Sequence, residues 1–193
     1  MIDSAVVAAL GPLVQTLDRL EVRYYLAGSI ASSAHGIARA SLDADVVVFL
    51  GPQHLDPLVA SLAEQYYIPV ERLRSAVERR SSCNFIHLDT MFKIDLFMSK
   101  GRPFDLEAAS RAQPRTLDEG PGAATFPVAS PEDTVLAKLE WFRAGGETSE
   151  RQWWNILGVL RVTAHADLAS LGRWATRLSV DNLLRRALID AAS

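Results

Sequence analysis

The sequence contains very little cysteine and no long apolar run. Cys83 is the single cysteine. This excludes an internal disulfide framework and a cysteine-rich zinc site, and it fits a reducing compartment. No apolar segment approaches the ~20 residues that are needed to cross a bilayer. Residues 1–4 also lack the basic region of a signal peptide. We therefore expect a cytoplasmic protein without a membrane partner.

A marked excess of charge of either sign is also missing. The chain of 193 residues has 20 Lys and Arg against 23 Asp and Glu, a formal net charge of -3. With a pI of about 5.8, no general attraction to nucleic acid is implied. A helix expected at residues 70–80 carries several arginines, and we interpret them as a solvated face rather than a nucleic-acid site. They are Arg72, Arg74, Arg79 and Arg80.

Two acids open an otherwise apolar segment at residues 43–50. Side chains alternate between the two faces of a strand, so Asp43 and Asp45 point to the same side. Neighbouring carboxylates repel each other and resist burial, which favours a cation between them. Mg²⁺ is the natural candidate, because it prefers hard oxygen ligands and is commonly shared with substrate phosphates.

A Gly-Ser turn precedes this strand and follows an expected strand at residues 22–27. Gly28 permits a tight turn and a close approach of the backbone to a ligand, and Ser29 can cap a short helix at residues 29–35. The start of a helix suits an anion. Arg39 is the first cation within reach of a triphosphate there, although an ion pair with Asp43 or Asp45 would equally explain it. The stretch therefore predicts a metal-nucleotide site.

The order of these motifs resembles the nucleotidyltransferase superfamily, which includes DNA polymerase beta, kanamycin and lincosamide nucleotidyltransferases, and AbiEii-type toxins. The motifs are the Gly-Ser pair, a helix, Arg-x-Ser-x-Asp-x-Asp and an apolar strand. The resemblance implies an α+β fold with a small mixed β-sheet core and flanking helices. It implies that Gly28 and Ser29 bind the triphosphate and that Asp43 and Asp45 hold two Mg²⁺ ions. One departure is Ala27, where many relatives have glycine.

The resemblance also implies a third acid from a later strand. Residues 84–88 and 91–97 are separated by a short turn, which predicts a hairpin. Asp95 lies in its second strand and is the expected third metal ligand. Lys93 shares a face with Asp95 by the two-residue period, so we expect it to balance charge when no metal is bound.

The C-terminal third is expected to be helical. Ser130-Pro131-Glu132-Asp133 combines a capping serine, a proline at the first helical position and acids in the first turn. Further helices are expected from residue 149 and at residues 167–178 and 180–191. We therefore divide the chain into a nucleotidyltransferase core at 1–129 and a C-terminal helical bundle at 130–193.

This tail resembles AbiEii-like and related bacterial nucleotidyltransferases. The resemblance implies that Lys138, in the first tail helix, faces the nucleotide triphosphate. Asn155 stands where relatives frequently have an aspartate in the second helix. Asparagine can hydrogen-bond, but it cannot act as a base or add charge.

Together these features predict an enzyme that transfers a nucleoside monophosphate from an NTP to an acceptor hydroxyl and releases pyrophosphate. Asp95 would complete a metal site and accept the acceptor proton. The acceptor is a small molecule, tRNA or another RNA, or a protein, with the acidic pI favouring a small molecule or protein. The alternative is a non-catalytic protein of the same fold, an antitoxin-like or regulatory partner of a neighbouring gene's product.

Five further expectations concern local structure and packing. Residues 4–20 should form a helix that is kinked or restarted at Gly11-Pro12. Residues 126–128 should form a last edge strand. His35 should make a local hydrogen bond at a helix end, and Cys83 should be a structural thiol. Helical spacing favours core packing over base stacking for the tail tryptophans, which are Trp141, Trp153 and Trp154.

Overall fold

The structure is a computed structural model that describes residues 4–35, 43–117, 124–163 and 167–192. Within these ranges the strands form one mixed sheet in the order β3-β4-β5-β2-β1-β7-β6. In chain order the strands are β1 (Tyr24–Leu26), β2 (Asp43–Val48), β3 (Tyr66–Tyr67), β4 (Ser82–His87), β5 (Lys93–Met98), β6 (Gln113–Thr116) and β7 (Thr125–Val128). The pairs β2/β5 and β1/β7 are parallel, and the others are antiparallel. The expected α+β class and mixed sheet are confirmed.

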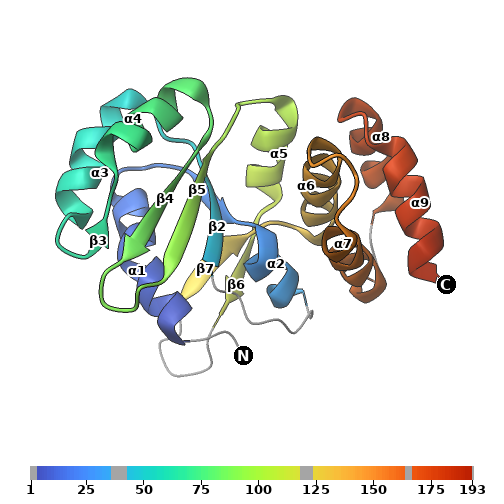
Figure 1. Ribbon diagram of the computed structural model, residues 1–193, viewed down its shortest axis with the longest axis horizontal. Coiled ribbons are helices and arrows are strands. Elements are labelled where there is room, and N and C mark those ends of the chain that lie inside the picture. Colours follow the sequence, from blue (N-terminus) through green and yellow to red (C-terminus); the bar gives the residue numbers. More distant parts are fainter. Residues whose placement is uncertain (1–3, 36–42, 118–123, 164–166, 193) are drawn as a thin grey trace.

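Helices pack on both sides of this sheet (Figure 1). They are α1 (Ser4–Arg19), α2 (Gly28–Ala34), α3 (Leu55–Leu62), α4 (Val70–Arg79), α5 (Pro103–Arg111), α6 (Pro131–Ala144), α7 (Glu150–Val162), α8 (Leu168–Arg177) and α9 (Asp181–Ala192), with a 3-10 turn η1 (Pro52–His54) before α3. Helices α1, α3 and α4 lie beside one another on one side, and α6 to α9 form a group on the other (Figure 1). Helices α2 and α5 lie between that group and the sheet (Figure 1).

Strand β2 shows why one face of the sheet remains accessible. Ala44, Val46 and Val48 are fully buried, whereas Asp43 and Asp45 on the opposite face are partly exposed. The alternation is the period-2 pattern of a strand with one covered face and one partly open face. The acids therefore occupy the open face, as their spacing predicts.

The predicted hairpin and the strand at residues 126–128 are confirmed, but the predicted edge position of that strand is wrong. Strand β7 pairs with β6 on one side and β1 on the other, and β6 is the edge. All four residues of β6 are exposed, so the segment lacks the apolar alternation that marks a strand. Pro127 is tolerated inside the sheet because β7 pairs with β1 at a single register position, Leu26 with Val128.

The predicted restart of the first helix is wrong, and a kink at Gly11-Pro12 stays a prediction. Helix α1 runs from Ser4 to Arg19 with Pro12 inside it. Leu10 and Leu13 are fully buried beside the proline. Their burial outweighs the backbone hydrogen bond that Pro12 cannot make.

The predicted start of α6 is confirmed and is tied to α5 by a buried ion pair. The backbone N–H of Asp133 donates to Ser130 Oγ at 3.1 Å, and the Ser130 hydroxyl donates to Asp133 Oδ2 at 2.7 Å. Arg111 of α5 donates from Nη2 to Asp133 Oδ1 at 2.6 Å and from Nε to Oδ2 at 3.0 Å. Asp133 is only 2% exposed. This network holds the start of α6 against α5.

We expect Asp133→Ala to lower the free energy of unfolding by about 2 kcal/mol, because charge-assisted hydrogen bonds are lost and a helix cap is weakened. Urea denaturation measures this. Glu107→Ala is the matched control, since Glu107 pairs with the same arginine at 2.8 Å but its side chain is 51% exposed. Its effect should stay below ~1 kcal/mol. Equal losses in the two variants would contradict the structural role of Asp133.

The tail helices are confirmed, but only one of the three tail tryptophans is buried as predicted. Trp153 is buried as expected, whereas Trp141 is 58% exposed and Trp154 is 61% exposed, so core packing is wrong for these two. Helix α6 contacts α2 as well as α7, α8 and α9. The boundary at residue 130 stays a prediction. No helix within the described ranges has both the length and the apolar character to cross a membrane.

Candidate active site

Three aspartates line the same open face of β2 and β5. The parallel register places Asp45 opposite Asp95 and Asp43 opposite Lys93. Lys93 Nζ donates to Asp95 Oδ2 at 2.6 Å and lies 3.5 Å from Asp43 Oδ2. The Asp95 side chain is 22% exposed and that of Asp43 is 42% exposed. The lysine therefore bridges two of the acids, and its predicted charge-balancing position is confirmed.

Asp45 has the most strained electrostatic environment of the three. Burial first, and then the negative charges of Asp43 and Asp95, raise the pKa of Asp45 to about 6. Lys138 and Lys93 act in the opposite direction. A cation at this carboxylate would relieve both the desolvation and the repulsion.

Gly28 lies directly against Asp45. Its φ of +60° is a left-handed conformation, and a Cβ placed there would overlap the Asp45 carboxylate, 2.6 Å from Cγ. The Ala27 N–H donates to the Asp45 backbone oxygen at 2.9 Å, so the turn is pinned to β2. Gly28 is also the first residue of α2, and Ser29 follows it, half-buried. The structure thus brings the predicted glycine turn and the acid pair into contact.

Lys138 reaches this site from α6. Its charge lowers the pKa of Asp45, which places the amine within electrostatic range of that carboxylate. His35, at the end of α2, makes a hydrogen bond through Nε2 to the Ala129 oxygen at 2.8 Å. The predicted helix-end hydrogen bond of His35 is made by its backbone N–H, which donates to the Ala31 oxygen at 3.1 Å, while its ring joins α2 to the segment before α6. Arg39 lies outside the described residues.

An aromatic pair lies near the acids; Phe97 was not singled out from the sequence, and Trp141 was assigned to the core. The Phe97 and Trp141 rings lie 5.5 Å apart at an interplanar angle of 69°. Phe97 shares the face of Asp95 two residues later, and Trp141 follows Lys138 by three residues, which is nearly one helical turn. These two spacings are the sequence pattern from which the position of the two rings near the acids could have been predicted. Cys83 is buried, and burial raises its pKa, as expected for a structural thiol.

The donor set fits Mg²⁺, although it is not closed around one point. Among the described residues, no three His, Cys, Asp or Glu side chains gather closely enough to hold a metal as they stand. The Lys93 amine lies between Asp43 and Asp95 instead. Carboxylate oxygens are the ligands that Mg²⁺ prefers, and substrate phosphates commonly complete its shell. The pKa of Asp45 is raised by burial and by its two acidic neighbours, and a bound cation would offset both effects.

Lys93→Met should therefore tighten divalent-metal binding. The change keeps the aliphatic stem and removes a competing cation, so the Kd for Mn²⁺ should fall about 2- to 5-fold, the scale of an exposed ion pair. Calorimetric titration with Mn²⁺ measures this. The metal-free variant should also melt at a lower temperature, because the acids lose their counter-charge. Lys100→Met, on an exposed lysine, is the control. Weaker Mn²⁺ binding by Lys93→Met would show that the lysine does not occupy the cation position.

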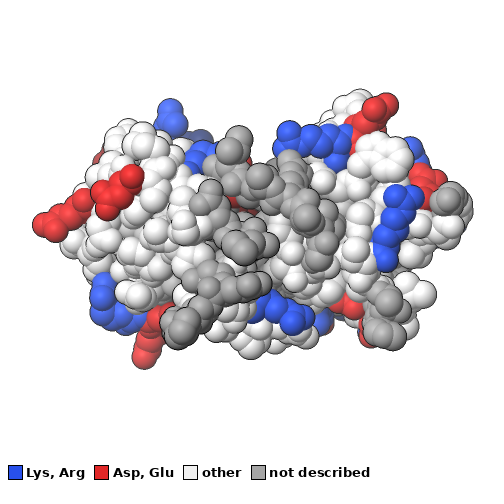
Figure 2. Space-filling view, turned by 90° about the horizontal axis from the view of Figure 1, so that it is seen from below, with Lys and Arg blue, Asp and Glu red and all other residues white. Residues whose placement is uncertain are grey.

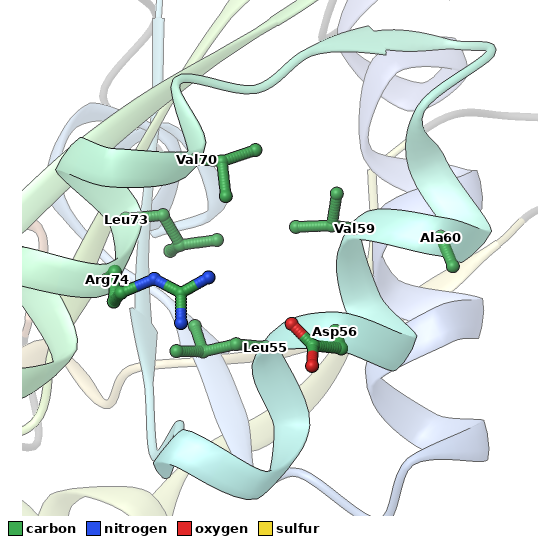
Figure 3. A pocket seen from close by; sticks show the side chains of 7 residues that line it. All are labelled: Leu55, Asp56, Val59, Ala60, Val70, Leu73 and Arg74. Carbon is green, nitrogen blue, oxygen red and sulfur yellow. The ribbon is translucent and has the colours of Figure 1, made fainter.

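A pocket away from the acids lies on the other part of the sheet domain's surface, between two helices. Figure 3 shows it between α3 and α4, lined mainly by apolar side chains with Asp56 and Arg74 at one side. None of its lining residues belongs to β2, β5 or α2. It therefore takes no part in the acidic site.

The chain is similar in fold to solved structures of known proteins. No family model and no curated protein sequence matches the chain. The lincomycin-bound crystal structure of the lincosamide antibiotic adenylyltransferase LnuA matches with a TM-score of 0.50 and 16% identity, over 84% of this chain and 99% of that one. An antigenic nucleotidyltransferase-like protein from Paracoccidioides brasiliensis matches with a TM-score of 0.51 and 16% identity, over 93% of each chain. The chain has the nucleotidyltransferase fold. The AbiEii-like branch of that fold, inferred from the tail, stays a prediction.

Proposed function

We propose that this protein is a Mg²⁺-dependent nucleotidyltransferase that transfers a nucleoside monophosphate from an NTP to an acceptor hydroxyl. The observation that carries the proposal is the contact between the Gly28 turn and Asp45, with Asp43 and Asp95 on the same face. A phosphate cradle beside a cluster of carboxylates is what transfer from a metal-bound triphosphate requires.

Each residue has a role in this proposal. Asp43, Asp45 and Asp95 would hold two Mg²⁺ ions, which when bound polarise the attacking oxygen and neutralise the leaving pyrophosphate. Gly28 leaves room for the triphosphate backbone, and Ser29 and Lys138 would bind its oxygens, joined by Arg39. Asp95 would take the proton from the acceptor hydroxyl once Lys93 has released it. Catalysis is then mainly positioning and charge stabilisation.

The acceptor that we favour is a small molecule. LnuA acts on lincosamide antibiotics and carries lincomycin in its structure. The present chain has a net charge of -3. Over the described part of the face in Figure 2, basic and acidic side chains are scattered rather than gathered into a basic patch. A polyanionic acceptor such as tRNA would be favoured by a basic patch and a positive net charge.

The test is transfer itself. Wild-type protein is incubated with Mg²⁺ and each α-³²P-labelled NTP, together with lincomycin, kanamycin, bulk tRNA or the protein alone. The proposal predicts a labelled small-molecule product and an equal amount of pyrophosphate. Label in the tRNA or protein fraction would reject the small-molecule acceptor. Absence of pyrophosphate under every condition would count against enzymatic activity.

A further inference from the structure

The tryptophan on α6 is exposed beside the acidic cluster. Trp141 is 58% exposed, whereas Trp153 and Trp174 are 8% and 5% exposed. Its ring makes an edge contact with Phe97, at 5.5 Å between centroids. An indole that is more than half exposed leaves apolar ring surface accessible to a ligand.

The order of strands places this aromatic pair on a definite side of the acids. Gly28 follows β1, Asp45 lies on β2, and Asp95 and Phe97 lie on β5. Because β2 lies between β1 and β5, the carboxylates separate the glycine turn from the aromatic pair. Phe97 pairs with Val47 in the β2/β5 register, one face-sharing step beyond Asp45 and Asp95.

The geometry of in-line displacement indicates from which side of the carboxylates the acceptor approaches. The attacking and leaving oxygens lie on opposite sides of the phosphorus that is transferred. If the pyrophosphate rests at Gly28 and the transferred phosphorus lies at the carboxylates, the attacking hydroxyl arrives from the β5 side. That is the side on which Phe97 and Trp141 lie.

Two of the acids near the pair already have ion-pair partners. Glu140, next to Trp141 on α6, accepts hydrogen bonds from Arg102 at 2.7 and 3.0 Å. Asp95 accepts one from Lys93 at 2.6 Å. Recognition on this side must therefore come largely from the aromatic surface, which suits a flat apolar ring face rather than a polyion.

We propose that Trp141 and Phe97 form the acceptor subsite, on which the flat ring face of a small, hydroxyl-bearing cyclic compound stacks. The assignment rests on the proposed function, because the direction of attack defines which side is the acceptor side. Trp141 supplies the stacking face, and Phe97 holds the indole through its edge contact. Both are specificity-determining residues and take no part in proton transfer.

The experiment uses ¹⁹F NMR of the full chain labelled with 5-fluorotryptophan, which gives one signal for each of its 4 tryptophans. Single Trp→Phe variants assign the signals. The probe is 4-nitrophenyl β-D-glucoside, which carries both an aromatic ring and a hydroxyl-bearing ring. Trp154 is the matched control, because it is 61% exposed and lies on α7.

We expect the probe to shift the Trp141 signal and leave the Trp154 signal in place. Trp141→Ala should weaken probe binding about 2- to 12-fold, the range for one aromatic contact. Equal shifts of the two signals, or no shift at all, would overturn the subsite. The same holds if Trp154→Ala weakens binding as much as Trp141→Ala does.

A second titration separates this proposal from the function on which it rests. Mg²⁺ and a non-hydrolysable ATP analogue are added to the probe-bound protein. Persistence of the Trp141 shift while the analogue binds supports an acceptor subsite. Displacement of the probe by the analogue would show that Trp141 and Phe97 bind the nucleobase, and it would overturn the proposal. A Trp141 shift in a protein that binds no nucleotide at all contradicts the proposed function, while the aromatic binding site remains.

Discussion

Asp45→Asn is expected to reduce nucleotide transfer by at least ~100- to 1000-fold, the scale of losing one preorganised electrostatic group. The asparagine keeps the shape of the side chain but removes a charged ligand from the centre of the cluster. Asp45 is the residue in contact with Gly28, so its loss affects both the metal and the triphosphate. Pyrophosphate release, or in its place Mg²⁺-dependent NTP binding, measures the effect.

The same substitution should not destabilise the metal-free protein. Asp45 is disfavoured as an anion by burial and by the charges of Asp43 and Asp95. Asp89→Asn, in the exposed turn of the hairpin, controls for the loss of one negative charge. A marked fall in melting temperature for Asp45→Asn without metal would contradict the account, because it would show that the carboxylate is structural.

The sign of the pH dependence follows from the raised pKa of Asp45. In the unfolded chain an aspartate titrates near ~4, whereas in the folded protein Asp45 titrates at about 6. Below the lower value the carboxyl is protonated in both states and contributes no penalty. Between the two values the unfolded chain loses this proton while the folded protein keeps it, so the penalty on wild type grows with pH. Above the higher value the carboxyl is ionised in both states and the penalty is constant. The difference in melting temperature between metal-free Asp45→Asn and wild type should therefore increase in favour of the variant between pH ~4 and ~6, and it should be constant above that.

Gly28→Ala is expected to abolish nucleotide binding and to destabilise the fold. A left-handed conformation costs a non-glycine residue about 1–2 kcal/mol. The added Cβ would also overlap the Asp45 carboxylate, so the carboxylate or the turn must move. Urea denaturation measures the stability, and Mg²⁺-dependent NTP binding measures the site.

Gly101→Ala separates these two effects. Gly101 has a φ of +69°, and a Cβ there would meet nothing within 4 Å. This control should lose about the same backbone contribution and keep full NTP binding. If Gly28→Ala bound Mg²⁺-NTP as well as Gly101→Ala does, the contact between Gly28 and Asp45 would have no role in the site.

Local sequence patterns predicted the parts of the site that depend on short-range rules. The alternation in β2 placed Asp43 and Asp45 on one face, and the hairpin placed Asp95 and Lys93 on its second strand. The capping group at Ser130 fixed the start of α6. Each of these follows from backbone geometry within a few residues, so the chain alone carries the information.

Features that join distant segments were not predictable in this way. The bond of His35 to Ala129 spans 94 positions. The exposure of Trp141 depends on how α6 lies against β5, which helical spacing does not specify. Strand β6 has no apolar side because it is an exposed edge. In each case tertiary packing, rather than local preference, decides the outcome.

The most direct test of the account is a thermal-shift titration of metal-free wild type and Asp45→Asn with ATP, GTP, CTP and UTP, each with and without Mg²⁺. A ligand at ~100 times its Kd stabilises the folded state by about 2.7 kcal/mol, which is about 5–10 °C for a domain of this size. We expect at least one NTP to raise the melting temperature of wild type only with Mg²⁺, and none to do so for Asp45→Asn. Equal shifts in the two proteins, or no shift with any NTP and Mg²⁺, would contradict a metal-nucleotide site at these acids.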